Sequence, residues 1–140
     1  MSKPKVPEGF SPHFKKSEFT NPWEPLYSSI LNDRVLIGLY LSKAHCNSRG
    51  FVHGALIAAV ADNAMGLSCG QILKSSNSKA TGLLTISLHT DYTSTAKVGA
   101  WLVVNTDFIK CGRSVCFARS FVKADEKVIA TSSATFKVLY

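Results

Sequence analysis

Acidic residues are scarce in this chain. It carries nine Asp and Glu against sixteen Lys and Arg, a formal net charge of +7, and Asp62 is the sole acidic residue between Asp33 and Asp91. Such a basic excess raises the question of a nucleic-acid partner. The basic residues are mostly scattered singly, however, and no basic helix, RNA-binding aromatic strand or zinc-finger spacing is present. We therefore expect no nucleic-acid partner, although a few basic side chains would suit the phosphates of a smaller, nucleotide-like ligand.

The sequence also lacks a Cys-x-x-Cys pair, a strictly apolar run long enough for a membrane span, and the pattern of a signal peptide. The four cysteines form no Cys-x-x-Cys pair, which argues against a structural metal site and favours reduced thiols. The strictly apolar stretch of the expected core helix covers only residues 55–61, whereas a membrane span needs roughly 20. Lys3, Lys5 and two prolines stand at the N-terminus before any apolar run, so it is not expected to be a signal peptide. We expect a cytoplasmic protein with no metal and no membrane contact.

The length of 140 residues suits a single domain. All five prolines lie within residues 1–25, so this segment is expected to be an extended or partly ordered arm. Residues 26–140 would form one domain. Its first predicted strand covers residues 34–41, which are rich in β-branched and aliphatic side chains.

A long helix is predicted over residues 53–73. Apolar or small residues occupy nearly every face of this segment, which predicts a helix buried all round. Gly66 and Gly70 are four residues apart and fall on one face. Their missing side chains are expected to let the backbone approach a strand or another helix closely.

Four strands are predicted after the helix, over residues 84–92, 100–108, 114–123 and 128–138. The first alternates strictly, with one face carrying Leu84, Ile86, Leu88, Thr90 and Tyr92. Short breaks between the strands suit hairpin connections. One buried helix with consecutive hairpin strands predicts an α+β fold, in which an antiparallel sheet curls around a central helix.

Asp62 stands in the middle of the apolar helix, where a carboxylate is costly unless it is paired or faces a pocket. Alternatively, Asp62 is a structural residue of the core whose carboxylate is hydrogen-bonded within the protein and has no catalytic role. Upstream, His53-Gly54 would begin the first turn, whose free N–H groups can hold a developing oxyanion. Asp62 would lie about 12 Å along the axis from Gly54, at roughly 1.5 Å per residue. The two can serve one carbonyl group only if a second subunit contributes, which predicts a dimer.

Two segments together resemble a known family signature. Residues 45–55 (HCNSRGFVHGA) and 61–66 (ADNAMG) match the spacing of H-x-N-x-x-G-x-x-H-G-G…A-D-x-A-x-G, found in hotdog-fold thioesterases of the phenylacetate-degradation (PaaI-like) type. Residues 91–97 look like the strand of that family that runs into a "P-A" turn. Residues 110–113 are similar to its "K-x-G-R" hairpin. The resemblance covers residues 34–138, most of the chain.

The resemblance implies a hotdog-fold acyl-CoA thioesterase with active sites shared between the subunits of a dimer, usually paired into a tetramer. The Gly54 N–H would polarise the thioester carbonyl, and Asn47 and His53 would shape that side of the pocket. Asp62 of the partner chain would act as a general base on water or as a nucleophile. Thr85 aligns with a hydroxyl that helps place the water and the carboxylate. His53 could equally brace the helix, and Thr85 could be a plain strand threonine.

Three hairpin residues are candidates for binding the phosphates of coenzyme A: Lys110, Gly112 and Arg113. Alternatively, Lys110 and Arg113 are only surface charges near a hairpin. No separate cofactor is expected, because coenzyme A is part of the substrate. Two positions depart from the family signature. Ala55 replaces the second glycine and Thr95 replaces the turn proline. We expect Ala55 to change the shape of the pocket modestly while the oxyanion hole is kept.

Two other functions compete with hydrolysis. A non-catalytic acyl or coenzyme A binding protein would keep the pocket without turnover, and Ala55 counts slightly for it while Asp62 and Gly54 count against it. A hotdog dehydratase or hydratase would need a histidine and a carboxylate in another arrangement. The sequence leaves the acyl group open among short-chain, medium-chain and phenylacetyl-like substrates.

Overall fold

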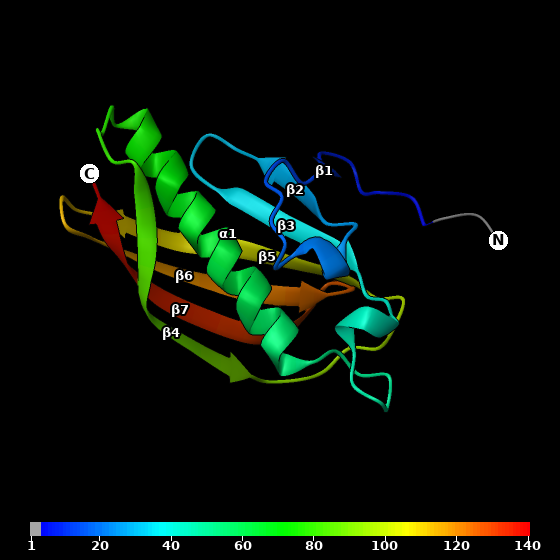
Figure 1. Cartoon of the computed structure of the whole chain (residues 1–140). Coiled ribbons are helices and arrows are strands. Elements are labelled where there is room, and N and C mark those ends of the chain that lie inside the picture. The colour runs from blue at the N-terminus through cyan, green and yellow to red at the C-terminus, as the bar shows by residue number, and fades with distance from the viewer. Residues whose placement is uncertain (1–3) are drawn as a thin grey trace.

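One long helix lies across a curled antiparallel sheet in the computed structural model, which describes residues 4–140 (Figure 1). The strands are ordered β1-β2-β3-β5-β6-β7-β4 across the sheet, and every neighbouring pair is antiparallel. The elements in chain order are β1 (Ser11–Pro12), η1 (Asn21–Trp23), β2 (Tyr27–Ile30), β3 (Val35–Tyr40), η2 (Lys43–His45), α1 (Gly54–Ser75), β4 (Gly82–Tyr92), β5 (Trp101–Cys111), β6 (Val115–Ala124) and β7 (Lys127–Leu139).

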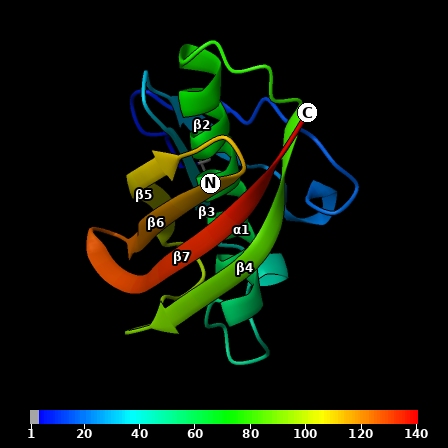
Figure 2. The ribbon, with the colours of Figure 1, turned by 90° about the vertical axis from the view of Figure 1, so that its left-hand side faces the viewer.

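The hydrophobic core fills the space between α1 and the concave face of the sheet. The helix contacts β3, β5, β6, β7 and β4, and Figure 2 shows the sheet curving around it. Met65 of α1 and Leu39, Leu102 and Ile129 of the strands are fully buried there. Removing these apolar side chains from water is the main force that holds helix and sheet together. The predicted α+β arrangement, a sheet curled around a central helix, is confirmed.

The helix begins and ends within two residues of its predicted bounds, but the prediction that it is buried all round is wrong. One face, with Asp62, Asn63, Gly66 and Gly70, is only half-buried. By length and composition alone α1 could also cross a membrane, yet half of its most apolar stretch is buried inside the protein. Its contacts with five strands are those of a core helix.

The N-terminal segment packs on the domain. Within the predicted arm, β1 pairs with β2, with Ser11 opposite Ser28. The His13 N–H donates to the Leu26 carbonyl at 2.9 Å, which ties the next residues to the same region. The strand β2 was not predicted; it has only four residues, between the proline-rich segment and the first predicted strand.

The four strands predicted after α1 are all present; β4, β5 and β7 are slightly longer than expected, and β6 has the expected length. In β4 the strict alternation is wrong, because a bulge interrupts the pairing with β7 between Thr85 and Ser87. Thr85 and Tyr92 are seven residues apart and would face opposite ways in a regular strand. Both nevertheless hydrogen-bond α1, since the extra residue Ile86 reverses the alternation between them.

Candidate active site

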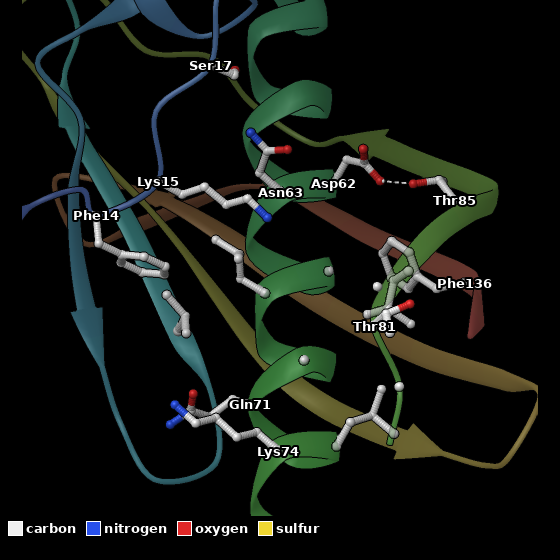
Figure 3. A pocket seen from close by; sticks show the side chains of 18 of the residues that line it. Phe14, Lys15, Ser17, Asp62, Asn63, Gln71, Lys74, Thr81, Thr85 and Phe136 are labelled. Carbon is white, nitrogen blue, oxygen red and sulfur yellow. Dashed lines mark hydrogen bonds between the residues drawn. The ribbon is translucent and has the colours of Figure 1, made fainter. Parts of the chain in front are cut away.

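A groove of about 720 Å³ runs along the half-buried face of α1 (Figure 3). The start of β4 forms one wall and the segment from His13 to Thr20 contributes to the other. Of the helix residues that line it, Asp62 lies nearest the N-terminus and Lys74 nearest the C-terminus. The groove therefore runs along α1 from the Asp62 carboxylate toward the C-terminus of the helix.

Two glycines contribute to the width of the groove. A Cβ atom added at Gly70 would meet nothing within 4 Å, so the prediction of close backbone approach is wrong at this position. At Gly66 the added atom would lie 3.5 Å from the Phe136 ring, which is ordinary van der Waals contact. Both residues line the groove, and their missing side chains leave room for a ligand beside the helix.

Asp62 is held by a side chain from β4. The Thr85 hydroxyl donates a 2.8 Å hydrogen bond to Asp62 Oδ1, and both residues line the groove (Figure 3). The β4 bulge follows Thr85 directly. Because the hydroxyl occupies one carboxylate oxygen, the other is left to accept a hydrogen bond from water or to attack a carbonyl carbon.

The N-terminus of α1 presents an unused backbone donor. His53 caps the helix, because its Nδ1 accepts the Ala55 N–H at 3.1 Å. The carbonyl of His53 accepts the N–H groups of Leu56 and Ile57. The Gly54 N–H makes no hydrogen bond within residues 4–140. It thus points an orphan donor, at the positive end of the helix dipole, toward any anion that binds there.

Tyr92 packs against Gly54. Its sequence position predicted only that it belongs to a strand. Its hydroxyl donates to the Gly54 carbonyl at 2.6 Å, and a Cβ atom at Gly54 would lie 3.1 Å from the ring. Burial raises the pKa of the Tyr92 phenol, so the hydroxyl keeps its proton and stays a donor. Only the bulge brings Tyr92 to this side of the sheet, and strict alternation could not reveal it.

The loop before the helix orients Asn47. The Asn47 Oδ1 accepts the N–H groups of Arg49 and Phe51, at 3.0 and 3.2 Å. With its oxygen occupied, the half-buried side chain has its NH₂ group left to donate. Gly50 adopts a φ of +83°, a conformation that favours glycine, and its carbonyl accepts the Val98 N–H.

Two other histidines lie apart from the groove. His45 is buried, accepts the Ser42 N–H on Nδ1 and donates from Nε2 to the Trp23 carbonyl at 2.8 Å, so it anchors the loop. His89 is exposed on β4, with its Nε2 atom 3.0 Å from the Asp91 carboxylate.

The structure brings the predicted residues together in two groups. Asp62 and Thr85 face the groove, whereas Asn47, His53 and Gly54 gather at the start of α1 and do not line it. Eight residues separate Gly54 from Asp62 on one continuous helix, which corresponds to about 12 Å. A single chain therefore holds two half-sites, and one carbonyl group cannot reach both.

The predicted phosphate-binding hairpin lies elsewhere. Gly112 and Arg113 line a second cavity, of about 430 Å³, together with Ile72 near the C-terminus of α1. Lys110 is exposed at the end of β5. This hairpin is at the opposite end of the helix from Gly54, so within one chain it does not join either half-site. Its role toward coenzyme A stays a prediction.

A long helix embraced by an antiparallel sheet is the architecture of the hotdog class of proteins. Here the helix also carries a carboxylate that faces a groove and, at its start, a backbone N–H that is free among the described residues. Residues 49–131 match the family model described as "Thioesterase superfamily". A curated Pseudomonas aeruginosa protein, named as a "putative esterase", is 31% identical over 132 residues, covering 94% of this chain and 96% of the relative. The chain belongs to the thioesterase superfamily.

Solved structures agree with the fold. A variant of the phenylacetic acid degradation protein PaaI from Thermus thermophilus superimposes with a TM-score of 0.75 at 18% identity, over 88% of this chain and 100% of that one. A hypothetical thioesterase from Streptococcus pneumoniae, solved with coenzyme A, gives 0.72 at 17% identity, over 83% and 90%. The predicted hotdog fold is thereby confirmed.

Proposed function

We propose that this protein hydrolyses acyl-CoA thioesters, with Asp62 as the catalytic carboxylate. The observation that carries the proposal is the Asp62–Thr85 pair, which points a fixed carboxylate into a groove on a helix otherwise free of acidic residues. Membership of the thioesterase superfamily supports hydrolysis. The coenzyme A bound by the streptococcal thioesterase supports the choice of thiol carrier.

In the proposed mechanism each active site combines the two half-sites from two different copies of the chain. The Gly54 N–H and the Asn47 amide of one copy hold the thioester oxygen and stabilise its negative charge as the carbonyl is attacked. Asp62 of the other copy takes a proton from water, whose oxygen then bonds to the carbonyl carbon. In the alternative route the carboxylate attacks directly and forms an anhydride, which water opens. In either route the carbon–sulfur bond breaks, the thiolate of coenzyme A takes up a proton to become the thiol, and the free acid is left.

The exposed surface of β4 supports such a dimer. This strand ends the sheet, and an unpaired edge offers a row of N–H and C=O groups to a second copy. Leu84, Ile86 and Leu88 are 55%, 58% and 40% exposed, and a partner along this edge would cover these apolar side chains. Because β4 also carries Thr85 and Tyr92, pairing through it would set the two half-sites close to one another. Two such dimers would make the proposed tetramer.

The first experiment assays purified protein against a small acyl-CoA panel with a free-thiol reporter. The panel contains short-chain, medium-chain and phenylacetyl thioesters, and each is tested with wild type and Asp62→Ala. Turnover by wild type that the variant lacks supports the proposal and begins to define the acyl group. Binding of acyl-CoA without turnover on any substrate would replace it with a non-catalytic binding function.

A further inference from the structure

Three of the four cysteines meet under the C-terminal half of α1. The Sγ atoms of Cys69, Cys111 and Cys116 all lie within 4.8 Å of one another. Cys111 and Cys116 face each other across the β5–β6 hairpin, and Cys69 reaches them from α1. The Cys111 thiol donates to the Cys69 carbonyl at 3.7 Å, and all three thiols are free. The sequence contains no Cys-x-x-Cys pair, so the fold alone creates this cluster.

The cluster can be reached from solvent through one of its members. Cys69 and Cys116 are fully buried, whereas Cys111 is half-buried and lines the 430 Å³ cavity at the end of α1. Lys79 and Arg113 line the same cavity, and none of its lining residues is acidic. These two positive side chains repel a metal cation that approaches through the cavity, whereas a neutral ligand is not repelled.

The surroundings also favour a ligand that leaves no net charge. Burial raises the pKa of the Cys111 thiol to about 12 and raises that of Cys69 still more strongly, so both thiols keep their protons. Three thiolates around a monovalent or divalent cation would leave a negative charge in this apolar place, at high cost. Zinc would in addition need a fourth ligand, and the cluster holds three. A trivalent metalloid bonded to three sulfurs is neutral and needs no fourth ligand.

We propose that Cys69, Cys111 and Cys116 form a binding site for a trivalent metalloid hydroxide, of which arsenite is the simplest. Arsenous acid is neutral, and the reaction consumes one molecule of it and three thiol groups. Three arsenic–sulfur bonds form, three arsenic–oxygen bonds break, and each hydroxyl leaves as water with one thiol proton. No electron is transferred, and the product is neutral too. The bound metalloid would tie α1 to the β5–β6 hairpin, independently of hydrolysis at Asp62.

Native mass spectrometry of the reduced full-length protein, titrated with arsenite, tests the proposal. The expected adduct is one arsenic per chain, with a mass increase of one arsenic atom less three hydrogens. An adduct that keeps a hydroxyl on arsenic has only two sulfur ligands and would overturn the three-thiol site, as would no adduct. A zinc titration run in parallel should give no comparable complex; zinc bound as tightly by the same thiols would also overturn the proposal.

The variants assign the adduct to the cluster. Cys111→Ala, at the half-buried position, should weaken arsenite binding by roughly tenfold or more. Cys116→Ala should do the same, and circular dichroism shows whether each variant is folded. Cys46→Ala removes the one cysteine outside the cluster and should bind as wild type does. Equal binding by wild type and Cys111→Ala, or a comparable loss in Cys46→Ala, would contradict the assignment.

Discussion

The Thr85 hydroxyl of β4 donates a hydrogen bond to the Asp62 carboxylate of α1, with 2.8 Å between Oγ1 and Oδ1. This hydrogen bond fixes the orientation of a carboxylate that would otherwise rotate about its side-chain bonds. Since a hydrogen bond to a charged group is worth about 1.5–3 kcal/mol, its loss should be measurable in catalysis.

Thr85→Val keeps the shape of the side chain and removes the donor. We expect kcat to fall by roughly tenfold to a hundredfold, the equivalent of that hydrogen-bond energy. Thr85→Ser restores the hydroxyl and should recover most of the rate. Steady-state acyl-CoA hydrolysis by the three proteins is the measurement. A Thr85→Val enzyme with wild-type kcat would show that the hydroxyl plays no part in hydrolysis.

Gly54→Ala should impair hydrolysis because the new methyl group would lie 3.1 Å from the Tyr92 ring. The ring or the helix start must shift, and the Gly54 N–H moves with it. We expect kcat/KM to fall by roughly tenfold to a hundredfold, as small misplacements of catalytic groups do.

Gly70→Ala is the matched control, since its methyl group would meet nothing within 4 Å. Alanine is the better helix former, so the free energy of unfolding should rise by about 0.5–1 kcal/mol, measured by urea denaturation. Gly70 lines the groove, so this control is compared on a short-chain substrate. A Gly54→Ala enzyme as active as wild type would remove the Gly54 N–H from the proposed mechanism.

Leu88→Lys places a charge on the edge strand β4, where the Leu88 side chain is 40% exposed. If two copies pair through this strand, the variant should be monomeric by analytical ultracentrifugation and should lose activity, because each site needs both half-sites. Val128→Lys changes an equally exposed apolar residue on β7 and should leave assembly and activity intact. A folded, active Leu88→Lys monomer would contradict the shared site.

His13 makes stability depend on pH. Burial is the main cause that lowers the pKa of His13, and the nearby positive charges of Lys16 and Lys15 lower it further. The Glu24 carboxylate raises the pKa, but the net effect is a lowered value. The unfolded chain therefore takes up the proton more readily, so the contribution of neutral His13 to stability is complete above about pH 6.5 and is lost as the pH falls below it. The Tm of His13→Gln should fall less than that of wild type between about pH 7 and about pH 5. Equal falls in wild type and His13→Gln would exclude His13 as the source of the pH dependence.

The sequence predicted the elements whose patterns are long. The helix and the four strands after it were each recognisable, because more than eight residues share one periodicity or one apolar composition. The four residues of β2 are too few to show a period. Asp62 could be singled out because a carboxylate on an apolar helix needs a compensating partner or a pocket.

Tertiary contacts created what the sequence could not show. The β4 bulge depends on how β7 pairs with β4, so neither the approach of Thr85 to Asp62 nor that of Tyr92 to Gly54 follows from alternation. The space beside Gly70 depends on what packs opposite the helix. The three-cysteine cluster likewise joins residues from the helix and a hairpin that sequence spacing kept apart.

The most direct test is the kcat of Asp62→Asn on the best acyl-CoA substrate. The asparagine keeps an oxygen that can accept from Thr85, so the fold should be retained while the base or nucleophile is lost. Asp107→Asn, a surface carboxylate beside Arg119, is the control and should match wild type. We predict a fall in kcat of roughly 10²–10⁴-fold for Asp62→Asn alone. A folded Asp62→Asn protein that hydrolyses acyl-CoA at the wild-type rate would contradict the account.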